Sequence, residues 1–226
     1  MKYVKIVRHR NGKEEEIQDI VIEERYIDLY VKDAFIDSIV YSPPNEDELI
    51  FGYLFLYGYL NEREDLKDIL YEAIGDHINC HVSIKNIEKE NILPNKKFEL
   101  DYDKFIELMN EVLSKSKIFR QTGGTHISGL SDGEEILSCF EDVSRRSTIY
   151  KVVGDAVLKR KIYEATLLFT SGRINSTAVQ YAKKAGIKAI LSHSAPTDLA
   201  IKKAREFNIT LIGFLRNNRF NIYTTI

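Results

Sequence analysis

The chain has 226 residues, 44% of them hydrophobic and 29% charged, which is enough to bury the core of one large α/β domain or of two smaller ones. Acidic and basic residues almost balance, to a formal net charge of -2, and this argues against a general nucleic-acid-binding protein, which needs an excess of positive charge. The sequence begins with charged residues, and its longest apolar stretch, near residues 49–60, is too short to span a bilayer, so we expect a cytoplasmic protein without a membrane segment.

The first half of the sequence is typical of a β-rich unit. Alternation of apolar and charged residues predicts half-buried antiparallel strands at residues 3–7, 17–23, 26–31 and 35–41. Ser42-Pro43-Pro44-Asn45 ends this sheet, and a buried helix is expected from there to about Leu60, with Asn45 as its N-cap. Residues 64–88 fit either a helix or a hairpin that turns at Gly75-Asp76. The apolar spacing of residues 102–115 predicts another helix.

The second half alternates short apolar segments with helical ones, as α/β folds do. The expected strands are residues 136–140, 165–169, 189–192, 209–214 and 220–224, and the expected helices are residues 144–158, 175–185 and 197–207. Such alternation predicts a mostly parallel sheet covered by helices. We therefore expect an N-terminal β-rich α+β part at residues 1–115 and an α/β domain at residues 116–226.

Four turns in the second half place small residues and hydrogen-bond donors where we expect strands to end. They are Thr122-Gly123-Gly124-Thr125-His126, Glu141-Asp142-Val143-Ser144-Arg145-Arg146, Ser171-Gly172-Arg173-Ile174-Asn175-Ser176 and Ser194-Ala195-Pro196-Thr197-Asp198. Close backbone approach at glycine, free N–H groups at a helix start and a guanidinium group all suit a phosphate. Taken alone, each turn is also explained by a tight bend, a helix cap or an internal ion-pair network.

The order of these turns favours a ligand site. The last two follow consecutive strands of one predicted sheet, so Arg173 and Ser194 are expected at the same carboxyl edge, where open α/β sheets bind ligands. His77, Cys80 and His81 have metal-like spacing, but three such residues on an uncertain element are a weak signal. The sequence has no Walker loop, G-x-G-x-x-G motif or nucleophile elbow. We expect a phosphate-binding site without a metal cluster.

Several motifs, in this order along the chain, resemble the FdhD family of formate dehydrogenase accessory proteins, sulfur carriers for the molybdenum cofactor. The resemblance extends from about Ile22 to Thr224. The motifs are Glu46-Asp47-Glu48-Leu49-Ile50-Phe51-Gly52-Tyr53-Leu54, Thr122-Gly123-Gly124-Thr125-His126, Glu141-Asp142-Val143-Ser144-Arg145, Lys151 with Gly154, Ser171-Gly172-Arg173, Ser194-Ala195-Pro196-Thr197 and Leu211-Ile212-Gly213-Phe214-Leu215-Arg216.

The resemblance implies a fold, a ligand and partners. The fold is a cytidine-deaminase-like three-layer α/β domain, and the ligand is the guanine dinucleotide form of the molybdenum cofactor, of which GDP is a partial mimic. The implied partners are a second copy of the chain and formate dehydrogenase. The implied cofactor-binding residues are Phe214, Leu215, Arg216, Asn217, Asn218 and Arg219, together with Thr122, Gly123, Gly124, His126, Ser171, Gly172, Arg173 and Ser194.

The cysteines depart from the family pattern. Family members carry a Cys-x-x-Cys loop where this chain has residues 84–95, which contain no cysteine, and the chain's cysteines are Cys80 and Cys139. A persulfide relay needs a nucleophilic thiolate. The leading hypothesis is therefore a cofactor-binding accessory protein for a molybdenum or tungsten formate dehydrogenase. The alternatives are a sulfurtransferase that uses Cys80 or Cys139 with a cysteine desulfurase, and a nucleotide-binding enzyme of deaminase-like fold without zinc, since the deaminase metal signature is absent.

Overall fold

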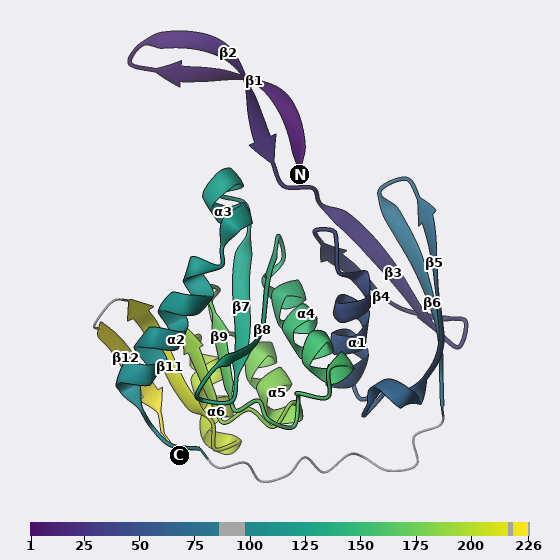
Figure 1. Ribbon diagram of the computed structural model, residues 1–226, viewed down its shortest axis with the longest axis vertical. Helices are drawn as coiled ribbons and strands as arrows, with labels where there is room; N and C mark the ends of the chain where they lie inside the picture. The colour runs from purple at the N-terminus through teal and green to yellow at the C-terminus, as the bar shows by residue number, and fades with distance from the viewer. Residues whose placement is uncertain (86–97, 217–218, 226) are drawn as a thin grey trace.

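The computed structural model describes residues 1–85, 98–216 and 219–225, and contains a two-stranded, a four-stranded and a six-stranded sheet (Figure 1). The expected α/β class with a β-rich N-terminal part is confirmed. Residues 86–97, which include most of the stretch where the resemblance implies a cysteine loop, lie outside the described residues.

The six-stranded sheet is mixed, and our expectation of a mostly parallel sheet is wrong. Its order is β12-β11-β10-β9-β7-β8. The strands are β7 (His126–Ser131), β8 (Ile136–Asp142), β9 (Leu167–Thr170), β10 (Ala189–Ser192), β11 (Thr210–Arg216) and β12 (Arg219–Thr224). The three central strands β9, β10 and β11 are parallel, whereas the β7–β9, β7–β8 and β11–β12 pairs are antiparallel. We expected no strand at β7, which connects to β8 by a short turn instead of a helix.

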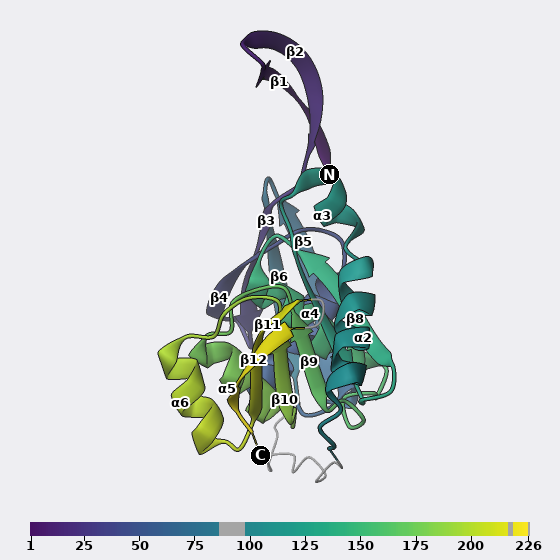
Figure 2. The same ribbon diagram turned by 90° about the vertical axis from the view of Figure 1, so that its left-hand side faces the viewer.

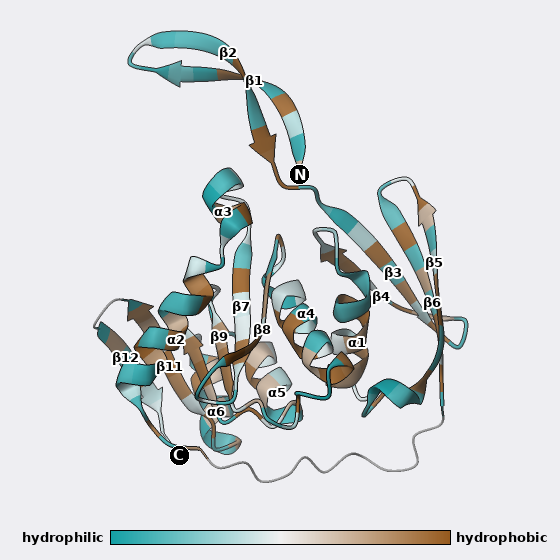
Figure 3. Ribbon diagram, viewed as in Figure 1, coloured by the Kyte–Doolittle hydropathy of each residue, from teal (hydrophilic) through white to brown (hydrophobic). Residues whose placement is uncertain are grey.

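Helices cover both faces of this sheet (Figure 2). The helix α2 (Tyr102–Ser114) packs on one face, and α4 (Arg145–Leu158), α5 (Ser176–Lys184) and α6 (Asp198–Glu206) pack on the other. Alternate side chains of one strand serve the two layers: Leu167 and Phe169 belong to the core beneath α2, and Leu168 to the core beneath α4. In Figure 3 the central strands of this sheet are coloured largely brown, which marks hydrophobic residues.

The four-stranded sheet has the order β4-β3-β6-β5 and packs with α1 (Glu46–Leu56) into the core that contains α4. Its strands are β3 (Arg25–Val31), β4 (Ala34–Tyr41), β5 (Leu66–Ile74) and β6 (His77–Ile84), and the short helix η1 (Arg63–Asp65) precedes β5. Of the two structures considered for residues 64–88, the hairpin with Gly75 and Asp76 at its turn is the one observed. Asn45 precedes α1, but its side chain bonds to Glu48 and caps no backbone N–H.

The remaining two strands, β1 (Lys2–Arg10) and β2 (Lys13–Val21), form a separate hairpin, which we call the arm. The sequence predicted both strands but placed them in one half-buried sheet with β3 and β4, and this is wrong: most of their residues are exposed. The arm projects from one end of the molecule, close to the short helix α3 (Lys117–Thr122) (Figures 1 and 2). No helix of the described residues is long and apolar enough to cross a membrane.

Candidate functional site

The predicted turns meet at one edge of the six-stranded sheet. The parallel strands β9, β10 and β11 end there, and because β7 runs antiparallel to β9, it begins there. The Thr122 turn is therefore a helix-to-strand turn between α3 and β7, not the strand-to-helix turn we expected. It reaches the same edge because the direction of β7 is reversed.

Hydrogen bonds link the turns directly. The Ser171 hydroxyl lies 3.3 Å from Nδ1 of His126 and accepts a bond of 3.0 Å from the backbone N–H of Ile127. The Ser194 hydroxyl donates to the Ser171 carbonyl at 2.8 Å, and the Phe214 N–H donates to the Ser194 carbonyl at 3.0 Å. Three of the predicted segments, around residues 126, 171 and 194, thus form one continuous polar rim that extends to β11.

A cavity of about 410 Å³ opens at this rim. Its polar lining comes from backbone and side chains of the rim and its apolar lining from α2, α3 and β7; the lining residues are Leu113, Ser116, Phe119, Gly123, Gly124, Thr125, His126, Ile127, Val143, Ser171 and His193. Small-molecule sites have this size and this mixture of apolar walls and a few polar groups.

The two histidines of the cavity are influenced by the charges of nearby arginines. Burial lowers the pKa of His126, and the positive charges of Arg145 and Arg173 lower it further. Burial and the charge of Arg216 lower the pKa of His193 in the same way. The side chains that depress both pKa values are those that would attract an anion, so the rim has the electrostatics of an anion site.

The Ser171 turn packs against the Arg145 side chain. A Cβ atom at Gly172 would lie 2.7 Å from Cδ of Arg145, so the guanidinium-bearing side chain lies directly against the glycine backbone. Arg216 donates from Nε to the His193 carbonyl at 3.1 Å, and Arg219 is its cross-strand neighbour. The charges of Arg145, Arg173 and Arg216 therefore act on the histidines of this rim.

Among the other predicted binding residues, Phe214 has a positive φ of 54° beside the Ser194 carbonyl, and Leu215 is buried in the core beneath α2. Thr122 is the last residue of α3, and its hydroxyl donates a hydrogen bond to the Ile118 carbonyl. Asn217 and Asn218 lie outside the described residues.

The family model described as FdhD/NarQ matches residues 78–226, which is more than half of the chain. The chain belongs to the FdhD/NarQ family. It is 32% identical to the sulfur carrier protein FdhD of Sulfolobus acidocaldarius, over 99% of this chain and 96% of that protein. It is 30% identical to the FdhD of Staphylococcus aureus strain MRSA252, over 97% and 92% of the two chains. A crystal structure of a candidate formate dehydrogenase accessory protein from Desulfotalea psychrophila, 25% identical, superposes with a TM-score of 0.82 over 99% of this chain and 96% of that one.

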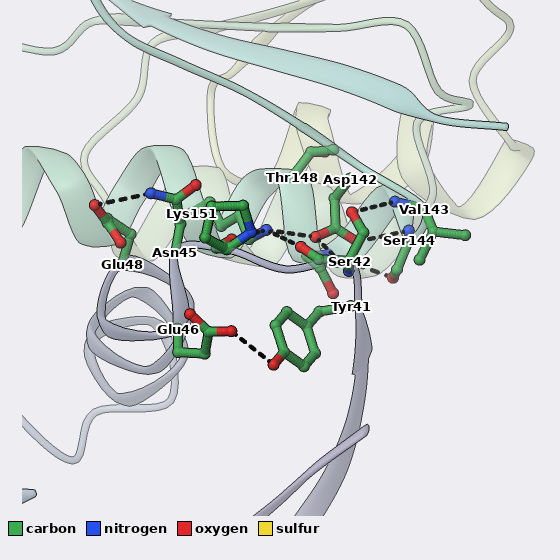
Figure 4. A network of polar contacts seen from close by, with 12 residues as sticks. Tyr41, Ser42, Asn45, Glu46, Glu48, Asp142, Val143, Ser144, Thr148 and Lys151 are labelled. Carbon is green, nitrogen blue, oxygen red and sulfur yellow. Dashed lines mark hydrogen bonds and ion pairs between the residues drawn. The ribbon is translucent and has the colours of Figure 1, made fainter. Parts of the chain in front are cut away.

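A buried ion pair in this FdhD/NarQ protein supports the turn that carries Arg145 (Figure 4). The Lys151 ammonium lies 2.7 Å from the Asp142 carboxylate, and the side chains are 2% and 0% exposed. Lys151 also donates to the carbonyls of Ser42 and Pro44, at 2.7 and 2.9 Å. Asp142 accepts the N–H of Ser144 at 2.9 Å, and therefore holds the start of α4 in place.

Burial raises the pKa of Asp142, and Lys151 opposes this rise by stabilising the carboxylate. An ion-pair network within this turn was one explanation of its sequence, but among the described residues Asp142 pairs with Lys151, outside the turn. Lys151 lies in the middle of α4, and its side chain reaches back to Asp142 at the end of β8.

Sequence reasoning missed the α2–α3 wall of the cavity. Glu141 fixes this wall: its carboxylate accepts the backbone N–H groups of Ile118 and Phe119, each at 2.8 Å, and the Thr125 hydroxyl at 2.9 Å. Phe119 is 51% exposed beside the cavity. The sequence carried a weak signal, because Glu141 stands in one of the motifs, but its partners 22 and 23 residues away could not be inferred.

Burial disfavours the thiolate form of both cysteines. Cys80 is buried on β6 and Cys139 half-buried on β8, and burial raises the pKa of each thiol to about 12. The described residues contain no group of three or more His, Cys, Asp or Glu side chains that could hold a metal ion. His77 instead bonds to Asp28, at 2.8 Å, and stacks on Tyr26.

Proposed function

We propose that this FdhD/NarQ protein is an accessory protein that binds the guanine dinucleotide form of the molybdenum or tungsten cofactor and supports the maturation of a formate dehydrogenase. The observation that carries the proposal is the cavity at the sheet edge, whose histidines lie within the influence of arginine charges, in a chain that matches proteins named sulfur carrier protein FdhD over nearly their full length. The description of the structural neighbour as a formate dehydrogenase accessory protein supports formate dehydrogenase as the enzyme that this chain assists.

The residues present fit the phosphate and nucleotide parts of such a ligand. Arg145, Arg173 and Arg216 supply guanidinium groups for a pyrophosphate, and the apolar wall around Phe119 suits a planar ring. A cavity of about 410 Å³ would take only one end of a dinucleotide cofactor. The bound cofactor would supply the metal chemistry of the client enzyme, and this chain's residues would bind and orient it.

Binding and delivery fit this chain better than sulfur transfer by its own thiols. A persulfide carrier requires a reactive thiolate, whereas Cys80 is buried, Cys139 is half-buried, and burial raises the pKa of both thiols. We propose in addition that the protein acts as a homodimer and that its large α/β layer is organised like a cytidine deaminase. The helices on both faces of the mixed six-stranded sheet support the latter.

Calorimetry with GDP tests the proposed site. We expect GDP to bind, and Arg173→Gln to weaken binding about tenfold or more, because a charge-assisted hydrogen bond contributes about 1.5–3 kcal/mol. Arg160→Gln is the matched control: it removes an arginine that pairs with Glu64 on another surface, and should leave the affinity unchanged. Absence of binding at millimolar GDP, or equal affinities for wild type and Arg173→Gln, would contradict the proposal.

A further inference from the structure

The four-stranded sheet has one buried face and one open face. Its inner side chains, which include Leu29 and Cys80, pack with α1 in the core. Side chains alternate between the two faces along each strand, so Leu70, Glu72 and Ile74 of β5 lie on the opposite face together with their cross-strand partners. That face is directed away from the rest of the molecule (Figure 1). We call it the outer face.

Apolar and aromatic side chains form two rows across the outer face, each with one residue from β5, β6, β3 and β4. Three of these side chains, Leu70, Ile74 and Phe35, are 54%, 60% and 58% exposed. Aromatic and aliphatic side chains gathered on an open surface are typical of protein–protein interfaces. One row consists of Leu70, His81, Tyr30 and Phe35, and the other of Ile74, His77, Tyr26 and Val40.

The rings of these rows hold one another in place. His81 stacks on Tyr30 with 4.7 Å between the ring centroids, and His77 stacks on Tyr26 with 4.9 Å. The Phe35 ring meets the Tyr30 ring edge-on, at 5.6 Å. Side chains that are already ordered lose little conformational entropy when a partner binds. The outer face is therefore arranged for a contact before any partner arrives.

An acidic row lies between the two apolar rows. Glu72 is the cross-strand neighbour of Asn79, and Asn79 is that of Asp28. The Asp28 carboxylate lies 2.8 Å from Nδ1 of His77, which keeps it in position. In this described part of the chain, none of the three rows contains a lysine or an arginine. The outer face thus combines apolar side chains with negative charge.

The acidic row limits what can bind to the outer face. It would repel the phosphates of nucleic acids and of anionic lipids. Two copies of the chain that met through this face would bring carboxylates together with no lysine or arginine between them, which costs free energy. The complementary surface is a patch on another protein where lysine or arginine is flanked by apolar side chains.

We propose that the outer face is the docking surface for the enzyme that this chain assists, a formate dehydrogenase, which would bind it through a basic and apolar patch. This rests on the function proposed above. Delivery requires the two proteins to stay together while the ligand passes between them, so a contact outside the ligand site is needed. None of the residues in the three rows lines the cavity of about 410 Å³, and the client can therefore be held while the cavity stays open.

Calorimetry with the purified formate dehydrogenase of the same organism, prepared without its cofactor, tests the proposal. Wild type should bind it, and Leu70→Ser should raise the Kd about tenfold, because apolar area that is buried in the complex is lost. Ile222→Ser on β12 is the matched control: it removes an apolar side chain that is 43% exposed on another sheet, and should leave the Kd unchanged.

Glu72→Lys tests the predicted charge of the partner. It should weaken the complex several-fold, and the Kd of this variant should rise less steeply with ionic strength than that of wild type, because an attractive charge pair is lost. Glu206→Lys at the exposed end of α6 changes the charge equally and should have no effect. Tighter binding by Glu72→Lys would mean that the partner patch is acidic, and would overturn the proposal.

GDP affinity and self-association are measured on the same variants, and both should be unchanged. A wild type that does not bind the client would remove formate dehydrogenase from the proposed function, and this docking surface with it. A wild type that binds the client as tightly as Leu70→Ser and Glu72→Lys do would overturn the docking surface alone. Weaker self-association in Leu70→Ser would show that the outer face joins copies of this chain, and would also overturn it.

Discussion

At the scale of single residues, the site is defined by what surrounds its two histidines. His126 begins β7 and His193 directly follows β10, and each is half-buried and influenced by arginines of other segments. The neutral imidazole is therefore favoured in the folded protein, so the stability due to His126 is present at high pH and is lost as the pH falls from its usual pKa towards the lowered one. An anion at the rim would offset the arginine charges and raise the pKa again.

The pKa of His126 can be followed by NMR. We expect it to titrate below its usual value in the free protein, and Arg173→Gln to raise its pKa because one of the nearby positive charges is removed. Arg160→Gln, which acts on a different surface, should leave the His126 titration unchanged. An ordinary or elevated pKa of His126 in the free wild type would contradict the expected lowering by burial and by the arginine charges.

At the scale of elements, one helix pair joins the N-terminal part to the large sheet. The helices α1 and α4 pack closely because Gly52 and Gly154 face each other: a Cβ at Gly154 would lie 1.8 Å from the Glu48 carbonyl oxygen, and one at Gly52 equally close to the Tyr150 carbonyl oxygen. Figure 1 shows the two helices side by side. The opposing backbones cannot move apart without separating the apolar surfaces of both helices, so the glycines determine how closely the two sheets approach.

Gly154→Ala therefore tests this contact. In an unobstructed helix interior, glycine to alanine stabilises by about 1 kcal/mol. Here we expect a destabilisation of at least about 2–3 kcal/mol, because the added methyl group overlaps a backbone carbonyl. Urea denaturation measures the change, and Gln180→Ala on the exposed side of α5 should be nearly neutral. A stabilised Gly154→Ala protein would mean that the helices are farther apart than described here.

At the scale of the whole molecule, the buried Asp142–Lys151 pair connects segments that lie far apart in the sequence. Lys151 bonds to the Ser42 carbonyl and Asp142 accepts the Ser42 N–H at 3.1 Å, so the end of β4, the end of β8 and the start of α4 meet at one point (Figure 4). The ligand edge of the large sheet is thereby fixed to the N-terminal part. Removing one partner would leave a buried charge without compensation.

Lys151→Met should destabilise the protein by about 3–5 kcal/mol, since the buried Asp142 carboxylate loses its counter-charge. Adding Asp142→Asn should recover part of the loss by removing the remaining charge. Lys159→Met is the control, because it breaks an ion pair with a 60% exposed lysine and should cost no more than about 1 kcal/mol. Equal losses for the single and double variants in thermal unfolding would contradict an electrostatic origin.

The sequence determined the features that depend on neighbouring residues. Hydrophobic periodicity indicated α2, α4, α5 and α6 within a residue or two of their observed bounds, and β-branched alternation indicated β1 to β4. The motifs indicated the family, and the turns after β9 and β10 indicated an edge at which Ser171 and Ser194 do meet. These predictions succeeded because side-chain spacing and turn chemistry are local properties of the chain.

Only the tertiary structure decided the rest. β7 pairs antiparallel to β9, and this direction brings the Thr122 turn to the ligand edge of the sheet. Hydrogen bonds from Ile118 and Phe119 to the distant Glu141 hold α3 in place as a wall of the cavity. The sequence of β1 and β2 resembles that of strands in a half-buried sheet, yet the arm lies apart from the body because other strands complete the small sheet. Strand pairing, burial and the charges around a histidine depend on segments distant in the sequence, and no local pattern specifies which distant segments will meet.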